Sequence, residues 1–243
     1  MATASLMRRV PAGAALKRRS TPKDRKHVAH SKKADLIRTT YTLMSDTSPQ
    51  DLSIRAIAAA AGCTTGAVYR HFESADHLIL VAAVKFLEDY IVDLNDLLKI
   101  TDDPLTQHME MWRSFGRQAF ANVDAFEMMF WKASEEALND AIFTYYQEFP
   151  ESWRKLSGFQ VMVFFSSSLE ERNMLTLNRC MEEFKLSKTT IKMINDVEIC
   201  SFHGLMMEYR ETYREPGKAE EGLIRYMSML DYILGTVRTV AQQ

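Results

Sequence analysis

The sequence predicts an all-α protein, with a small N-terminal three-helix domain and a larger helical C-terminal domain. Glycine and proline are scarce, at nine and six in 243 residues, so few positions interrupt a helix. Apolar residues recur at spacings of three and four over long stretches, which is the helical period. No segment shows the sustained alternation of β-branched and polar residues that is typical of strands. We therefore expect helices throughout.

Capping residues and breakers place these helices along the chain. Ser, Thr and Asp residues that suit N-caps precede most of the periodic segments, and Pro104 follows Asp103 at a first-turn position. Asp124 is also expected to cap a helix, and Pro150 to interrupt the chain. The apolar run 159–165 is too short to assign and fits either a short helix or an extended segment. The expected helices cover residues 31–45, 53–61, 64–71, 75–99, 102–122, 124–131, 134–149, 168–184, 187–213 and 218–240.

Residues 52–72 contain two short helical patterns on either side of Gly62. Ser53 suits the N-cap of the first helix, and Gly62 follows its last periodic residue, where a left-handed C-cap is favoured. Thr64 can cap the second helix, whose inward residues would be Ala67, Val68 and Phe72. The residues left on the outward side are Thr65, Gly66, Tyr69, Arg70 and His71. This pattern predicts a helix-turn-helix, although an ordinary helical hairpin of a core has the same caps and spacing.

The same segment resembles the DNA-binding domain of the TetR family of transcriptional repressors. The shared features are the pair Ile57-Ala58, Gly62, the small residues at 64–67, Tyr69-Arg70-His71-Phe72 and a helix start over residues 74–78. The resemblance implies a regulator that binds double-stranded operator DNA as a homodimer and is released by a small-molecule inducer. The alternative is a helical protein-interaction module that does not bind DNA. The residues expected to contact DNA are Lys32, Lys33, Ser53, Thr64, Thr65, Gly66, Tyr69, Arg70 and His71.

One position departs from the family pattern. Such proteins usually carry a lysine, which meets a DNA phosphate, where this chain has Ala75. Residues 1–33 could supply the missing charge, because they contain ten Lys or Arg and one acid, Asp24, whereas residues 34–243 carry a net charge of −11. We expect residues 1–30 to be a disordered basic arm. The arm either enters the adjacent minor groove or remains a solvated tail.

The expected domains are therefore the arm (1–30), the helix-turn-helix domain (31–78) and a helical ligand-binding and dimerisation domain (79–243). The sequence has neither an apolar segment of transmembrane length nor a signal-peptide core, which predicts a cytoplasmic protein without a membrane partner. Cys63, Cys180 and Cys200 are an odd number at wide spacing and are expected to be free thiols.

The last two long helices are expected to form the dimer interface, as the resemblance implies. The final helix has a wide apolar stripe that includes Leu223, Tyr226, Leu230 and Leu234. Such a stripe can also be buried within one chain, so part of this surface is expected to belong to the protomer's own core.

The region where such regulators hold an inducer is rich in methionine and aromatic residues, which adapt to varied apolar ligands. The residues expected to bind the ligand are Trp112, Phe115, Met128, Trp131, Phe143, Met174, Asn178, Met181 and His203. Each of the apolar ones can equally be ordinary core. Because residues 34–243 are strongly acidic, an apolar or cationic ligand is expected rather than an anionic one, unless a cavity arginine reverses this locally.

No catalytic residue, cofactor or metal is expected. The sequence contains none of the common phosphate-binding, nucleophile-elbow or metalloprotease motifs. Adjacent carboxylates such as Glu135-Glu136 diverge on a helix and cannot converge on one substrate. Cys200 and His203 share a helix face, but two ligands do not make a zinc site.

Overall fold

The computed structural model describes residues 31–88, 90–93, 102–153, 168–182 and 186–241. Over these residues the chain is helical and has no strand, which confirms the predicted all-α class. The described residues cluster as one compact unit. The predicted basic arm and the unassigned run 159–165 lie outside the described residues. No helix in the described parts is long and apolar enough to cross a membrane.

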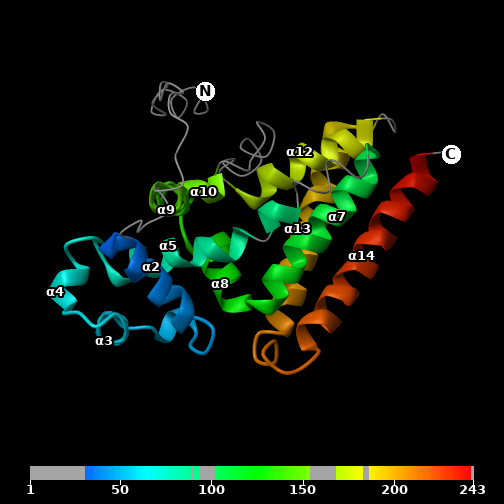
Figure 1. Ribbon diagram of the computed structural model, residues 1–243. Helices are drawn as coiled ribbons and strands as arrows, with labels where there is room; N and C mark the ends of the chain where they lie inside the picture. The colour runs from blue at the N-terminus through cyan, green and yellow to red at the C-terminus, as the bar shows by residue number, and fades with distance from the viewer. Residues whose placement is uncertain (1–30, 89, 94–101, 154–167, 183–185, 242–243) are drawn as a thin grey trace, which may run out of the picture. The chain divides into compact units, whose positions relative to one another are not determined.

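The N-terminal helices are short and closely spaced (Figure 1). They are α2 (Lys32–Leu43), α3 (Ile54–Ala60), α4 (Thr65–Val68) and α5 (Ala75–Ala83), with a 3₁₀ turn, η2, at Pro49–Asp51. Helix α2 packs against α3 and α5, and α3 packs against α4. A second 3₁₀ turn, η3 (Val84–Phe86), follows α5 directly, and residues 87, 88 and 90–93 are again helical.

The C-terminal helices are longer. They are α7 (Pro104–Ala121), α8 (Val123–Glu127), α9 (Glu135–Glu148), α10 (Pro150–Trp153), α12 (Leu169–Met181), α13 (Lys188–Glu208) and α14 (Lys218–Ala241), and residues Met128–Lys132 form a π-helical turn, η4. Helix α7 packs against both α12 and α14, and α13 packs against the same two helices. Figure 1 shows α7, α13 and α14 running side by side.

Most helix starts lie where the sequence predicts them, because the caps are local. Side-chain oxygens of the N-cap residues accept the backbone N–H three residues ahead. These caps are Ser31, Ser53, Thr64, Ser74, Asp103, Ser134, Ser168 and Ser187.

Two predicted boundaries are wrong. Asp124 does not cap a helix: Asn122 stands at the N-cap position of α8, and Asp124 lies buried in its first turn. Its carboxylate accepts hydrogen bonds from Arg210 Nε at 3.0 Å and from the Tyr213 hydroxyl at 3.3 Å, which satisfies it away from the helix end. Pro150 begins α10 instead of only ending α9, since its fixed φ suits a first helical position.

The core of the C-terminal helices is aromatic. The Phe202 ring of α13 lies 5.0 Å from Trp112 of α7 and 4.8 Å from Tyr226 of α14, measured between ring centroids. Two glycines allow α7 and α14 to approach closely. A Cβ atom on Gly222 would lie 2.6 Å from Phe120 Cδ1, and one on Gly116 would lie 2.9 Å from Leu223 Cδ1. Only glycine fits at these two positions without a shift of its neighbours.

Candidate functional sites

Helices α3 and α4 form a helix-turn-helix around Gly62. Gly62 has φ +61°, the left-handed conformation predicted for the C-cap. Helix α4 is only four residues long and is held by two side chains on its inner side, Val68 at 0% and Phe72 at 2% exposure. Tyr69 on its outer side is 54% exposed, and Arg70 and His71 are exposed next to it.

The remaining residues predicted to contact DNA lie beside this turn. Ser53 and Thr64 are exposed and act as N-caps, while Gly66 is exposed and Thr65 is partly buried. The Lys32 ammonium donates to the carbonyl of Ala61 at 3.3 Å.

Lys33 lies over the Phe72 ring, 5.4 Å from its centroid. Both lysines of α2 therefore stand close to the ends of α3 and α4. Ala75, the position at which a lysine is usual, is the first residue of α5 and is partly buried.

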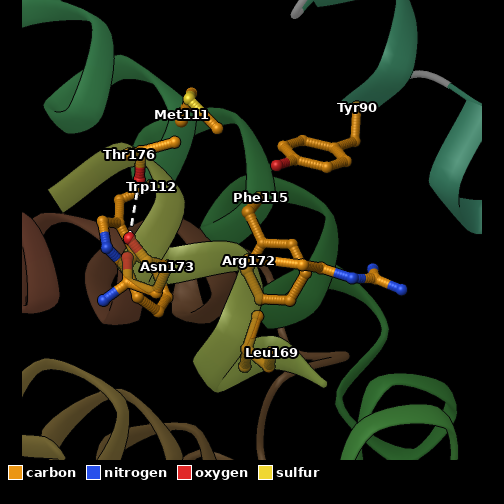
Figure 2. A pocket seen from close by; sticks show the side chains of 8 residues that line it. All are labelled: Tyr90, Met111, Trp112, Phe115, Leu169, Arg172, Asn173 and Thr176. Atoms are coloured by element: carbon orange, nitrogen blue, oxygen red, sulfur yellow. Dashed lines mark hydrogen bonds between the residues drawn. The ribbon is translucent and has the colours of Figure 1, made fainter. Parts of the chain in front are cut away.

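A cavity lies between α7, α12 and the helical residues that follow α5 (Figure 2). With its mouth it encloses about 370 Å³, of which about 30 Å³ admits the centre of a water molecule. One water needs about 10–15 Å³ of this smaller volume, so the space holds about two or three waters. Its lining consists of Tyr90, Met111, Trp112, Phe115, Leu169, Arg172, Asn173 and Thr176.

A buried polar cluster lies behind this cavity, and two of its members, Asn173 and Thr176, belong to the lining. Asn173 donates to Glu198 Oε2 at 2.6 Å and to Asn195 Oδ1 at 3.0 Å. His108 contacts the Thr176 hydroxyl through Nδ1 at 2.9 Å and the Glu198 carboxylate through Nε2 at 3.3 Å. His108 and Glu198 are fully buried. Their polar atoms therefore find hydrogen-bond partners within the protein and not in the solvent.

The helix-turn-helix has a match among known families. Residues 36–82 match the model of the bacterial regulatory proteins, tetR family. This segment is therefore a DNA-binding domain of the tetR type, and the chain is a DNA-binding transcriptional regulator, as the resemblance predicts.

Solved structures of TetR-family proteins share the fold of this chain. The transcriptional regulator PfmR from Thermus thermophilus is 17% identical, with a TM-score of 0.50, and the match covers 80% of this chain and 96% of that one. RolR in complex with resorcinol is 15% identical, with a TM-score of 0.51, and the match covers 87% of this chain and 93% of that one. A search among curated proteins found no match.

Of the nine residues predicted to bind ligand, two line the cavity, Trp112 and Phe115. The three predicted residues of α12 do not contribute to this lining. Met174, Asn178 and Met181 are outside the lining, which on this helix consists of Leu169, Arg172, Asn173 and Thr176. Asn173 and Thr176 of α12 are buried because Glu198 of α13 and His108 of α7 offer them hydrogen-bond partners.

The other four predicted residues also lie outside the lining. Met128 is partly buried in η4, and Phe143 on α9 is 50% exposed. Trp131 stacks on the His203 ring with a centroid distance of 4.3 Å, and His203 Nε2 contacts the Glu127 carboxylate at 2.7 Å. The stacked pair is therefore a separate, partly exposed cluster.

The polar residues behind the cavity were not predicted from the sequence. Asn195 and Glu198 interrupt an otherwise apolar stripe of α13 at a spacing of three, beside Ile194 and Ile199. A charged residue within an apolar stripe is costly to bury without a partner, so this pattern was a usable signal. The partners of Asn195 and Glu198 on α7 and α12 are 22 to 90 positions away in sequence and could not be identified from local spacing.

The stripe considered for dimerisation is mostly core of the protomer. Leu223, Tyr226, Leu230 and Leu234 are at most 4% exposed. Among the described residues, no group of three or more His, Cys, Asp or Glu side chains is arranged to hold a metal ion. Cys63, Cys180 and Cys200 are free thiols, as predicted.

Proposed function

We propose that this chain is a homodimeric transcriptional repressor that binds operator DNA through α4 and is released when a small molecule occupies the cavity beside α7 and α12. The observation that carries the proposal is the exposed face of α4, fixed from beneath by Val68 and Phe72 within a TetR-family domain. A second helix of a helix-turn-helix reads the major groove with its projecting side chains. In this proposal Thr65, Gly66, Tyr69, Arg70 and His71 face the groove, and Lys32, Lys33, Ser53 and Thr64 contact the DNA backbone.

An exposed apolar surface on α13 and α14 supports a homodimer. Met193 and Val197 on α13 are 64% and 45% exposed, and Ile224 and Tyr232 on α14 are 56% and 76% exposed. Large apolar side chains at helical spacing on a surface mark an interaction site. A two-fold axis through this surface would give two recognition helices for the two halves of a palindromic operator.

We assign residues 31–78 to the DNA-binding domain and 79–243 to the ligand-binding and dimerisation domain.

A chain of contacts connects the cavity to the DNA-binding helices. Tyr90 of the cavity lies two residues beyond Glu88, which accepts a hydrogen bond from Tyr145 of α9 at 2.6 Å. Helix α9 also contacts α5, where Asp140 pairs with His77 at 3.2 Å. A ligand that displaces Tyr90 therefore acts on the contact that holds α5.

Release by a ligand is a shift of population between two arrangements of the recognition helices. The small volume of the cavity fits such a shift, because a ligand can enter only an arrangement in which the cavity is wider. The RolR structure, which shares this fold, holds resorcinol. This function needs no catalytic step and no cofactor. We assign the protein to the cytoplasm, where a bacterial regulator meets its operator.

The test uses the full chain on DNA from its own genomic neighbourhood. Nuclease protection should reveal a palindromic site, and the logarithm of the affinity should fall linearly with the logarithm of the salt concentration. Arg70→Ala should weaken binding at least about threefold, whereas Arg117→Ala, on the exposed side of α7, should not. Transcription from a promoter that carries the site should fall when the protein is added.

Two results would contradict the proposal. Equal effects of the two arginine substitutions would remove α4 from the DNA contact. An affinity without salt dependence would favour the alternative of a protein-interaction module. For the dimer, Gly204→Arg places a charge on the exposed side of α13, where a Cβ meets nothing within 4 Å in the protomer, and should yield a folded monomer by light scattering.

A further inference from the structure

Helix α9 contacts α5 through a histidine. Asp140 Oδ2 of α9 lies 3.2 Å from His77 Nε2 of α5. Both ring nitrogens of His77 are shielded from solvent, so the carboxylate beside them partly offsets the loss of water. The same ring meets Phe72 edge to face, with centroids 5.7 Å apart and an interplanar angle of 75°. His77 therefore stands between α9 and Phe72, one of the two anchors of α4.

The C-terminal end of α9 contacts α2. The Ser31 hydroxyl, at the N-cap of α2, donates to the Glu148 carboxylate. The Phe149 ring lies next in the chain, and its centroid is 4.9 Å from Arg38 Cζ of α2, which is a cation–π contact. Asp140 and Phe149 are about 13 Å apart along the helix. Two contacts at this separation resist a rotation of the DNA-binding domain about either one.

The helices of the DNA-binding domain form one packed unit. Helix α2 packs against α3 and α5, and α3 packs against α4. The side chains at the centre of this unit are at most 2% exposed, and they include Ile37, Ile57, Val68, Phe72 and Leu78. A closely packed core transmits a displacement instead of absorbing it. The tilt of α2 and α5 against α9 therefore determines the orientation of α4.

The contacts made by α9 are weak ones. The side chains of Asp140 and Arg38 are exposed, and exposed ion pairs and cation–π contacts contribute little to stability. Helix α8 and the turn η4 also touch the DNA-binding domain, at η2 and α5. The domain therefore stays joined to the rest of the chain when an α9 contact is removed, and what increases is the range of tilts that it can adopt.

We propose that Asp140 and Phe149 of α9 are positioning residues, which fix the separation of the two recognition helices and thereby the half-site spacing that the dimer accepts. This inference rests on the proposed function, since it concerns a dimer on a palindromic operator. Two recognition helices at a fixed separation fit half-sites about one turn of DNA apart. Each added base pair moves one half-site by about 3.4 Å and also rotates it, so a firmly held domain rejects an altered spacing.

The experiment measures the affinity of the full-length protein for the palindrome found by nuclease protection, and for versions with one or two central base pairs added or removed. Fluorescence anisotropy at one salt concentration gives both affinities. The unmodified dimer should prefer the native spacing at least about tenfold. Asp140→Ala should reduce this preference at least about threefold. Phe149→Leu, which keeps an apolar side chain but removes the ring that faces Arg38, should do the same.

Glu136→Ala is the matched control, because it removes the same charge one turn earlier on the exposed side of α9. It should leave the preference between spacings unchanged. This preference is a ratio of two affinities, so partial unfolding of a variant does not alter it. A purely structural role would instead lower both affinities by one factor.

Three results would overturn the inference: an unmodified dimer that binds all spacings equally, an Asp140→Ala variant that keeps the full preference, or equal effects of Asp140→Ala and Glu136→Ala. Circular dichroism of each variant reports its folding. If Phe149→Leu fails to fold, the comparison of Asp140→Ala with Glu136→Ala decides. Failure of the unmodified protein to bind any palindromic site would refute the proposed function itself.

Discussion

Tyr69 is the large exposed side chain of α4, and its position makes it a direct test of DNA contact. It contributes nothing to the core, since Val68 and Phe72 provide the anchors of this turn. Tyr69→Ala should weaken operator binding by about 1–2 kcal/mol, the range of one lost phosphate hydrogen bond and its packing. The melting temperature should change little. A gel-shift titration measures the loss, and Tyr69→Phe shows how much of it comes from the hydroxyl. Unchanged affinity of the alanine variant would place Tyr69 outside the contact.

Asp124 shows the opposite case, a charged side chain that is held inside. Asp124 is 6% exposed; its carboxylate is paired with the Arg210 guanidinium and accepts a hydrogen bond from the Tyr213 hydroxyl. Asp124→Ala should lower the free energy of unfolding by about 2–3 kcal/mol, because the removal of one partner leaves the others without their acceptor. Asp196→Ala, which breaks an exposed pair with Lys192, should cost less than about 0.5 kcal/mol. Urea unfolding of both variants checks the difference, and equal losses would contradict it.

At the residue scale, local chemistry was readable from the sequence and long-range pairing was not. The projecting residues of α4 follow from the helical period and one cap. The partners of Glu198 do not, because a buried carboxylate can be satisfied by any polar side chain that the fold brings near it. Arg172 is missed for the same reason: its sequence neighbours give no sign that it lines the cavity.

At the scale of helices, starts were predicted better than interruptions. Caps such as Ser134 and Ser187 act over three residues and are visible in the sequence. The 3₁₀ turn at Val84–Phe86 and the π-helical turn at Met128–Lys132 have no such signature. Both segments consist of good helix formers and aromatic residues, so their irregular hydrogen bonding arises from packing and not from local propensity.

The close approach of α7 and α14 gives a prediction at the same scale. Gly222→Ala should lower the free energy of unfolding by about 1–3 kcal/mol, because the new methyl group meets the fully buried Phe120 ring, which has no space to move into. Helix propensity alone would predict a gain of about 1 kcal/mol. Gly235→Ala on the same helix meets nothing within 4 Å and should show that gain or no change. Thermal unfolding at one protein concentration compares them, and a stabilised Gly222→Ala would disprove the tight contact.

For the molecule as a whole, buried tyrosines predict loss of stability at alkaline pH. Burial raises the pKa of Tyr90 and of Tyr213 to about 12, and it also raises the pKa values of Tyr145, Tyr146 and Tyr226. A raised pKa means that the folded state binds the proton more tightly than the unfolded state. The stabilisation is therefore complete below about pH 10, the unfolded pKa, and is lost as the pH rises toward about 12.

Arg172 has the opposite effect on stability at alkaline pH, because burial lowers its pKa to about 10. This single group opposes five tyrosines, so the tyrosines determine the direction of the change. Each tyrosine that titrates only in the unfolded state contributes about 1.4 kcal/mol per pH unit. Urea unfolding between about pH 8 and 11 should show a constant free energy up to about pH 9.5 and a decline above it. Tyr90→Phe should make the slope of this decline smaller by the contribution of one tyrosine. A flat profile over the whole range would contradict the raised pKa values.

The four-residue length of α4 has a consequence for how such a regulator can change its target. Its fold depends on Thr64 as the cap and on Val68 and Phe72 as anchors, and the two anchors point away from the exposed side. Substitutions at Thr65, Tyr69, Arg70 and His71 therefore alter what the surface can recognise while sparing the residues that hold it in place. Selection can retune the operator preference of this domain by single steps without passing through unfolded intermediates, which makes its specificity free to diverge faster than its structure.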